Sequence, residues 1–393
     1  REVLLRKRAE GMIQSDPDEP EVHVVFSTDC NPFQDWQTLL VFHSGQTVGQ
    51  KGHMTRIASG CPEKKKKELV ALYKELYPNY YIHFTPDFKK DAKTKKKYEF
   101  YNKPYGVQHW LDHAEPKVGS GVIVAVIDPD FVFLRPLTAK VKGNNNNIVS
   151  GPVKESDIVD YVSKGHPVAQ QYGLGAPWVY DNNKEFNRTR ICGADSPCVK
   201  VPDHRTGSKY WSVGPPYLLE RDDLHRLTQT WTKFVPRVYE NYPQLLAEMF
   251  AYSMAGAHEE LPHLRMDNYM VSNVAMSGGE GWKWVDKLPD VCKPPVNGIY
   301  FPDKPLPNFL HYCQFFRSRE IGFQKRRVKK DIFSCEQDLL LEPPSDLGFA
   351  TYMIRNGNRE EMNEEARKRN GFALCVLHRS INAAATDYKE RMC

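Results

Sequence analysis

The sequence predicts an α/β fold in which helices flank a mostly parallel central sheet. Residues 121–127 (GVIVAVI) form an almost uninterrupted apolar run, which is typical of a strand buried on both faces of a parallel sheet. Predicted strands and helices also alternate along the first third of the chain, as they do in βαβ units. With 393 residues, 40% of them apolar, the chain can bury a sizeable core.

Each predicted element follows from its local pattern. Residues 63–77 place Leu69, Tyr73 and Leu76 at helical spacing, whereas residues 22–28 (VHVVFST) are rich in β-branched and aromatic side chains. Asp35 and Asp222 are predicted helix caps. The predicted strands are residues 22–28, 80–84 and 121–127, and the predicted helices are residues 35–48, 63–77, 104–114, 222–234 and 242–257. A further helix around residues 358–370 is predicted to be charged and solvated.

The predicted domain organisation has one large domain with two flanking segments. Residues 1–20 are a charged lead-in without periodicity, residues 21–345 form the main α/β domain, and residues 346–393 form a C-terminal helical extension. Within the main domain, residues 137–210 are rich in Gly, Asn, Pro and Lys, which indicates a loop-rich insertion.

Charge and hydropathy exclude several classes of protein. The net charge of +5 is mild and spread over separate segments, so nucleic-acid binding is not favoured. No run of 18 apolar residues occurs, so no membrane span is predicted. The chain begins with Arg1, which suggests a processed product; membrane attachment would need a segment absent from this chain.

The nine cysteines favour an oxidising compartment. No CxxC pair occurs, which argues against a zinc ribbon or a thioredoxin-like motif. Cys192 and Cys198 lie in a polar loop and suit a local disulfide, beside the sequon that begins at Asn187. An odd count leaves at least one free thiol, for which Cys393 is the predicted candidate. The secretory pathway, in the Golgi or ER lumen, is therefore the predicted location.

The tripeptide Asp128-Pro129-Asp130 directly follows the apolar strand of residues 121–127. Ligands gather at the carboxyl ends of parallel strands, and two carboxylates there can hold a divalent cation. Hard oxygen ligands favour Mg²⁺ or Mn²⁺. The identical tripeptide at residues 16–18 has no strand before it and is assigned no function, so context distinguishes the two copies. A strand-ending turn is the alternative interpretation.

Other candidate side chains carry weaker signals. Glu248 is a carboxylate on an otherwise apolar helix face, and His311 follows an apolar pair and could ligate a metal. Arg56, Lys103 and Lys325 could each contact phosphate. The alternative for Glu248 is a residue at the rim of the helix, and the alternative for His311 is a core histidine with its hydrogen bonds satisfied. For the three basic residues the alternative is a solvated surface position.

The order of several segments resembles the plant and algal hydroxyproline O-arabinosyltransferase family and its sister family, the peptidyl-serine α-galactosyltransferases. The resemblance runs over roughly residues 22–345. The matching segments are FSTDCNPFQDWQ, GHMTRIASG, YNKPYGVQHWL, VIVAVIDPDFVFLRPL, WSVGPPYLLERDDLHRLTQTW, LLAEMFAYSMAGAHEELPH, NFLHYC, GFQKR and LLLEPP.

The resemblance implies a GT-A-type, Rossmann-like nucleotide-sugar-binding fold and makes residues 21–345 a catalytic domain. It implies a Mn²⁺ (or Mg²⁺) site formed by Asp128, Asp130 and His311, with Glu248 as the catalytic carboxylate. The residues that it assigns to donor binding are Thr28, Asp29, Arg56, Asn102, Lys103, Asp128 and Lys325. The sequence departs from the relatives at Asp128, where Glu is common, and over residues 138–208, where the acceptor region could lie.

The predicted function is a metal-dependent, retaining glycosyltransferase that moves L-arabinofuranose from a UDP-sugar onto hydroxyproline of secreted or cell-wall proteins. Transfer of galactose from UDP-galactose onto peptidyl serine is the alternative within the same resemblance. A metal-dependent nucleotide-sugar hydrolase and a non-catalytic binding module are alternatives from other classes. The predicted partners are a UDP-sugar donor and a peptide acceptor, without nucleic acid.

Overall fold

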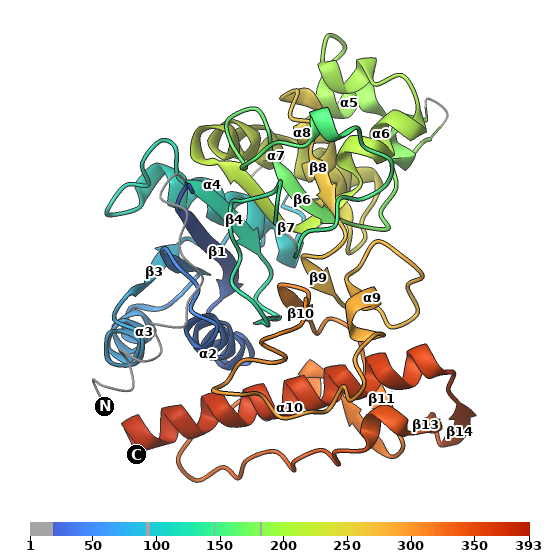
Figure 1. The fold of residues 1–393 in the computed structure, drawn as a ribbon. Helices are drawn as coiled ribbons and strands as arrows, with labels where there is room; N and C mark the ends of the chain where they lie inside the picture. Colours follow the sequence, from blue (N-terminus) through green and yellow to red (C-terminus); the bar gives the residue numbers. More distant parts are fainter. Residues whose placement is uncertain (1–18, 92–94, 145, 181–182) are drawn as a thin grey trace.

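The computed structural model describes residues 19–91, 95–144, 146–180 and 183–393 (Figure 1). Most of the predicted lead-in, residues 1–18, lies outside this part of the chain, together with the second copy of the Asp-Pro-Asp tripeptide at residues 16–18.

A seven-stranded sheet in the order β3-β2-β1-β4-β7-β6-β8 forms the centre of the molecule. β1 pairs in parallel with β2 and β4, β2 pairs in parallel with β3, and β6 pairs in parallel with β8, whereas β7 runs antiparallel to both of its neighbours. The strands are β1 (Val22–Asp29), β2 (Met54–Ser59), β3 (Tyr80–Thr85), β4 (Ile123–Ile127), β6 (Val168–Gln171), β7 (Val213–Glu220) and β8 (Leu264–Met266). The predicted α/β class with a mostly parallel sheet is confirmed.

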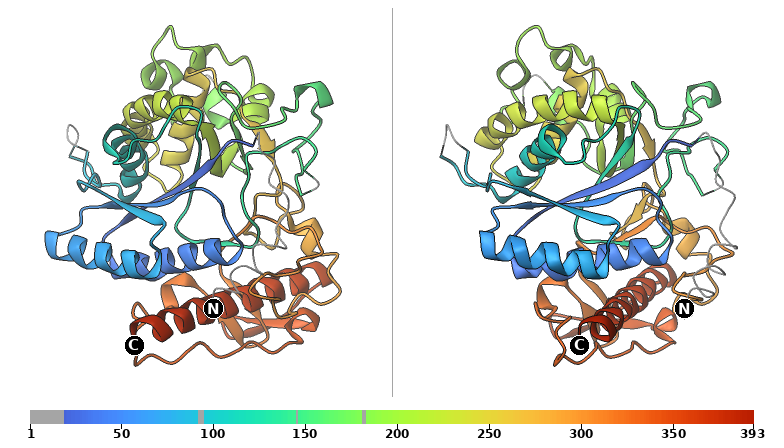
Figure 2. Two further views of the ribbon diagram at one scale, coloured as in Figure 1. Left: turned by 60° about the vertical axis from the view of Figure 1, so that its left-hand side comes forward. Right: turned by 90° about the vertical axis from the view of Figure 1, so that its left-hand side faces the viewer.

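Helices cover both faces of this sheet. Figure 2 shows α2 and α3, in blue, on one face, with the teal and yellow-green helices α4, α7 and α8 on the other. Side chains alternate along each strand, so Val24 and Phe26 join the core under α2, whereas Val25 joins the core under α4 and α8. These helices are α2 (Pro32–Thr47), α3 (Glu63–Leu76), α4 (Asn102–His113), α7 (Arg221–Asn241) and α8 (Ala247–His258).

The two predicted helix caps are wrong. The side chain of Asn31 accepts a hydrogen bond from Phe33 N, and Pro32 occupies the first turn of α2, so this helix begins before Asp35. Asp35 instead forms an ion pair with Arg56. At the start of α7, Glu220 rather than Asp222 accepts hydrogen bonds from the backbone.

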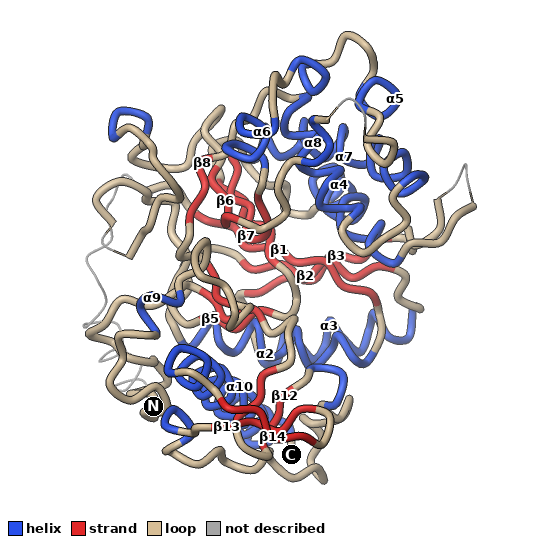
Figure 3. The backbone as a smooth tube through the Cα atoms, turned by 90° about the vertical axis from the view of Figure 1, so that its right-hand side faces the viewer, coloured by secondary structure: helices blue, strands red, loops and turns tan. Residues whose placement is uncertain are grey.

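Smaller sheets complete the fold. β10 pairs antiparallel with β5 and parallel with β9, and this three-stranded sheet adjoins the carboxyl end of β4. Figure 3 shows the strands β12 to β14 beside α10. These elements are β5 (Phe131–Phe133), β9 (Met270–Val271), β10 (Phe309–His311), β11 (Phe316–Ser318), β12 (Ile321–Phe323), β13 (Tyr352–Arg355) and β14 (Asn358–Glu361), with the helices α5 (Arg188–Cys192), α6 (His204–Trp211), α9 (Trp282–Val285) and α10 (Glu364–Met392).

The C-terminal helix differs from its prediction. Residues 358–361 form β14, and α10 continues far beyond residue 370, with Phe372, Val376 and Ile381 fully buried. The helix packs against α2, α9 and β11, so it is part of the core and not a solvated element. The charged residues of its first turn hid this buried continuation from the sequence analysis.

Four disulfides link the described chain. The predicted Cys192–Cys198 bridge is confirmed. Cys393 is bonded to Cys335 and is therefore not the free thiol; the free cysteine is Cys313. The other bridges join Cys30 to Cys61 and Cys292 to Cys375. No helix in the described residues is both long enough and apolar enough to cross a membrane.

Candidate functional site

Asp128, Asp130 and His311 form a cluster at the carboxyl end of β4. One ligand atom from each residue lies within 4.8 Å of the other two, and among the described residues only this cluster meets that condition. The register explains the approach, because β10 places His311 opposite Phe131 and Tyr312 N donates to the carbonyl of Asp130 over 3.0 Å. A histidine 181 positions from Asp130 in the sequence therefore reaches it through one antiparallel strand pair.

The chemistry of this cluster fits a divalent cation. Asp130 and His311 are both 5% exposed, and the buried Nδ1 of His311 has no hydrogen-bond partner among the residues that the structure describes. A buried imidazole nitrogen without a partner is costly unless it binds a ligand. Burial opposes the charge of Asp130, but His311 and Lys325 outweigh it and hold the pKa of the carboxyl far below its usual range. Asp130 is therefore ionised, as a metal ligand must be.

Two lysines contact the aspartates of the cluster. Lys103 Nζ lies 2.7 Å from Oδ1 of Asp128, and Lys325 Nζ lies 2.5 Å from Oδ2 of Asp130. Lys103 lies in the first turn of α4. Because Gly106 has no Cβ, this helix can pack closely on β2; an added Cβ would lie only 3.1 Å from a methyl of Ile57. Both lysines were predicted from the sequence, and the structure brings them to the aspartates.

Glu248 joins the same group of charges. Its Oε1 lies 3.3 Å from Lys103 Nζ, and the residue is only 2% exposed. The backbone N–H of Glu248 donates to the Tyr98 hydroxyl, and Trp231 Nε1 donates to the backbone carbonyl of Glu248. These two hydrogen bonds hold the first turn of α8 in place. Burial raises the pKa of the Glu248 carboxyl to about 7, although Lys103 acts in the opposite direction. A carboxyl that titrates near neutral pH in a polar cluster is a candidate catalytic group.

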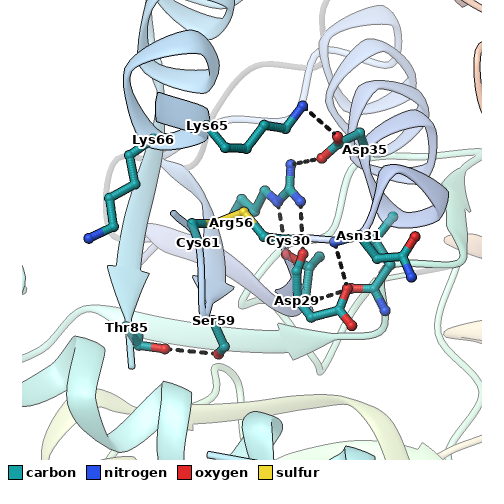
Figure 4. Close-up of a disulfide and its surroundings, with 12 residues drawn as sticks. Asp29, Cys30, Asn31, Asp35, Arg56, Ser59, Cys61, Lys65, Lys66 and Thr85 are labelled. Carbon is teal, nitrogen blue, oxygen red and sulfur yellow. Dashed lines mark hydrogen bonds and ion pairs between the residues drawn. A yellow bond between two sulfur atoms is a disulfide. The ribbon is translucent and has the colours of Figure 1, made fainter. Parts of the chain in front are cut away.

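Arg56 lies behind the ends of the strands. It is completely buried, and its guanidinium forms an ion pair with Asp35 at 2.9 Å and donates to Thr28 Oγ1 at 2.8 Å and to the carbonyl of Asp29 at 3.1 Å. Figure 4 shows the contacts of Arg56 with Asp35 and Asp29 beside the Cys30–Cys61 disulfide. Arg56 thus positions the end of β1; direct contact with a phosphate stays a prediction.

Thr28, Asp29 and Asn102 occupy the neighbouring strand ends. The carbonyl of Asn102 accepts from Ser27 Oγ, and its Oδ1 accepts from Phe88 N, so its side chain joins α4 to the segment after β3. Asp29 lines a cavity of about 340 Å³ at the carboxyl ends of β1 and β2. The other residues that line this cavity are Cys30, Asn31, Pro32, Ser59, Gly60, Pro62, Asp87 and Lys89.

A second cavity, of about 230 Å³, lies at the opposite ends of the strands and contains none of the predicted site residues. His23, His53 and His83 are among the side chains that line it. The charged cluster at the carboxyl end of β4 therefore remains the candidate site.

Sequence analysis missed two groups at the site. Cys313 follows His311 by two positions and affects its charge state, since burial lowers the pKa of His311 but Cys313 and Asp130 together raise it well above its usual value. Tyr217 is fully buried, and its ring stacks on Tyr252 at 3.8 Å. Within the described part of the chain, its hydroxyl has no hydrogen-bond partner. The position of Cys313 within NFLHYC was a usable signal, whereas nothing in the apolar strand around Tyr217 marked it.

Comparison with known proteins gives two related sequences. The chain is 23% identical over 401 aligned residues to a peptidyl serine alpha-galactosyltransferase of Chlamydomonas reinhardtii, which covers 95% of this chain and 46% of the relative. It is 34% identical over 259 residues to a protein of the same description from Arabidopsis thaliana. This aligned region covers 62% of this chain and 27% of the relative. The chain thus spans less than half the length of these curated relatives. No family model matches the chain.

Solved structures give distant matches. The galactosyltransferase LgtC, in complex with donor and acceptor sugar analogues, has a TM-score of 0.39 at 10% identity and covers 74% of this chain and 87% of its own. The bifunctional glycosyltransferase WbbM has a TM-score of 0.37 at 12% identity and covers 77% of this chain and 47% of its own. The fold class given above is based on the strand order and pairing of the central sheet.

Proposed function

We propose that this chain is a metal-dependent glycosyltransferase domain that transfers a sugar from a UDP-sugar onto a hydroxyl group of a peptide, with galactose as the sugar and serine as the acceptor. The observation that carries the proposal is the cluster of Asp128, Asp130 and His311 beside Glu248 at the carboxyl end of a parallel strand. Similarity over 95% of the chain to a peptidyl serine alpha-galactosyltransferase supports the choice of sugar and acceptor.

The difficult step is departure of the diphosphate from the anomeric carbon of the donor. Asp128, Asp130 and His311 would hold Mn²⁺ or Mg²⁺, which when bound supplies Lewis acidity to the leaving diphosphate. Lys325 is close enough to the aspartates to donate to the same phosphate oxygens as their charge grows. Asp29, whose carbonyl accepts a hydrogen bond from Arg56, borders the cavity that would take the nucleoside, and Thr28 precedes it on β1.

Glu248 would stabilise the positive charge that develops on the sugar. Its carboxylate faces Lys103 within the cluster, and its shielding from solvent strengthens any electrostatic contact. We further propose that the anomeric configuration is retained, as the resemblance implies. The acceptor hydroxyl would then either attack from the leaving-group face or react with a covalent intermediate on the enzyme.

Transfer of L-arabinofuranose onto hydroxyproline is the second candidate. The segments around Arg56, Asn102 and Asp128 resemble that family as well as its sister family. The descriptions of the two curated relatives favour galactose and serine. Four disulfides are consistent with an oxidising compartment, and we propose the Golgi or ER lumen as the place of action.

One incubation series tests the proposal. The protein is incubated with Mn²⁺ and either UDP-galactose or UDP-arabinofuranose, with serine-containing or hydroxyproline-containing peptides, and the peptide mass and released UDP are measured. Galactose added to the serine peptide, with UDP release that needs the peptide and is lost in Asp130→Asn, is the expected result. UDP release without any peptide product would indicate a hydrolase, and arabinose on hydroxyproline would favour the second candidate.

A further inference from the structure

We propose that Lys325 makes cation binding at the cluster depend on the diphosphate, so that the two ligands bind together and not one by one. This inference rests on the proposed function. The observation behind it is the contact between Lys325 and Asp130, in which an ammonium group lies 2.5 Å from a carboxylate that the cation also needs. Only 7% of the Asp130 side chain is exposed, so solvent does little to screen this contact.

The charges around the cluster nearly cancel. Asp128, Asp130 and Glu248 supply three carboxylates, while Lys103 and Lys325 supply two ammonium groups. With all five ionised and His311 neutral, as an imidazole that binds a cation must be, the net charge is −1. A dication entering alone gains the carboxylates but is repelled by both lysines at short range. A diphosphate that enters with the cation offers negatively charged oxygens to a lysine. The lysine then attracts the cation–diphosphate pair, whereas it repels the cation alone.

The surroundings of the two lysines assign this role to Lys325. Lys103 extends from the first turn of α4, is only 11% exposed and contacts both Asp128 and Glu248, so it keeps a carboxylate partner when the cation binds. Lys325 lies in the short helical turn after β12 and is 26% exposed, and Asp130 is its one ion-pair partner among the described residues. Its flexible side chain can therefore turn from Asp130 to a phosphate oxygen.

The coupling has a measurable signature. In Lys325→Met, which keeps the apolar stem and removes the charge, Mn²⁺ alone is expected to bind about tenfold more tightly than in the unmodified chain. UDP should then strengthen Mn²⁺ binding about tenfold less than it does in the unmodified chain, because the two ligands are linked reciprocally. Free Mn²⁺ is measured by electron paramagnetic resonance with and without UDP, and circular dichroism checks folding; Lys325→Gln serves if the first variant does not fold.

Two further variants make the test specific. Lys329→Met removes a charge from the same segment, but Lys329 Nζ donates to Gln337 Oε1 and not to a carboxylate of the cluster, so both affinities should stay unchanged. Asp130→Asn should lose Mn²⁺ binding with and without UDP. If Asp130→Asn binds Mn²⁺ like the unmodified chain, the proposed metal site fails. If that site holds but Lys325→Met binds Mn²⁺ alone no more tightly, the role of Lys325 is refuted.

Discussion

The ammonium group of Lys103 lies 3.3 Å from the carboxylate of Glu248, and both side chains are shielded from solvent. The same lysine lies closer to Asp128, at 2.7 Å, so the positive charge of Lys103 is divided between the two carboxylates. This sharing explains why burial, and not the lysine, determines the protonation of Glu248 and raises its pKa to about 7. Lys103 therefore contacts both Asp128 of the candidate metal site and Glu248, the candidate catalytic carboxylate.

The raised pKa of Glu248 predicts a pH-dependent stability difference from Glu248→Gln. Because the folded-state pKa is about 7 against an ordinary 4.5, the stabilising contribution of the protonated acid is present below pH 4.5 and is lost as the pH rises through 7. The unmodified chain should match the variant near pH 4 and become less stable than it by about 3 kcal/mol at pH 8. Urea unfolding at several pH values measures this, and a difference that does not change with pH would contradict it.

Glu248→Gln should also separate turnover from donor binding. The ionised carboxylate stabilises charge only as the sugar–phosphate bond breaks, so we expect a fall in kcat of about 10²-fold with little change in the affinity for UDP-sugar. In the unmodified chain, kcat/KM should rise with pH through about 7 as Glu248 ionises in the free protein. Steady-state kinetics and donor titration test this, and normal turnover with weakened donor binding would refute the assigned role.

Arg56→Met should destabilise the fold. It removes a completely buried guanidinium that pairs with Asp35 and anchors Thr28, so the expected cost is about 3 kcal/mol in the free energy of unfolding. Lys65→Met is a matched control, because Lys65 contacts the same Asp35 but is 31% exposed, and its loss should cost under about 1 kcal/mol. Equal, small effects of both variants in urea unfolding would argue against a structural role for Arg56.

The disulfides predict which thiol reacts. After unfolding without a reductant, alkylation and mass spectrometry should find a label on Cys313 and none on Cys393. Cys393→Ser should expose Cys335 to the reagent and reduce stability by about 2–4 kcal/mol, whereas Cys313→Ser should leave all four bridges intact. A labelled Cys393 in the unmodified chain would contradict this pairing.

The sequence predicted the fold class and three of the seven strands of the central sheet, β1, β3 and β4, because these depend on local patterns, whereas β2, β6, β7 and β8 were not predicted. The roles of the candidate site residues stay predictions. The apolar run before Asp128 was visible in the chain, whereas the residues alone marked His311 and Glu248 only weakly, and the resemblance implied their roles. The complete burial of Arg56 was not predictable. In a sequence, an arginine near the end of a strand is consistent both with a surface position and with a buried ion pair. The caps failed at Asp35 and Asp222 because a neighbouring residue made the better backbone contact.

The C-terminal region was the least predictable part. The charges at the start of α10 resemble a solvated helix, and only the packing against α2 and β11 shows that its later residues are buried. The bond between Cys335 and Cys393 likewise depends on how the end of α10 lies in space. Long-range contacts of this kind leave no periodic signal in the sequence.

The most direct test of the metal site is anomalous diffraction at the manganese edge from crystals grown with Mn²⁺ and UDP. A single strong peak bounded by Asp128, Asp130 and His311 is the expected result. A peak elsewhere, or none at this cluster while UDP is visibly bound, would contradict the proposal that these three side chains hold the cation.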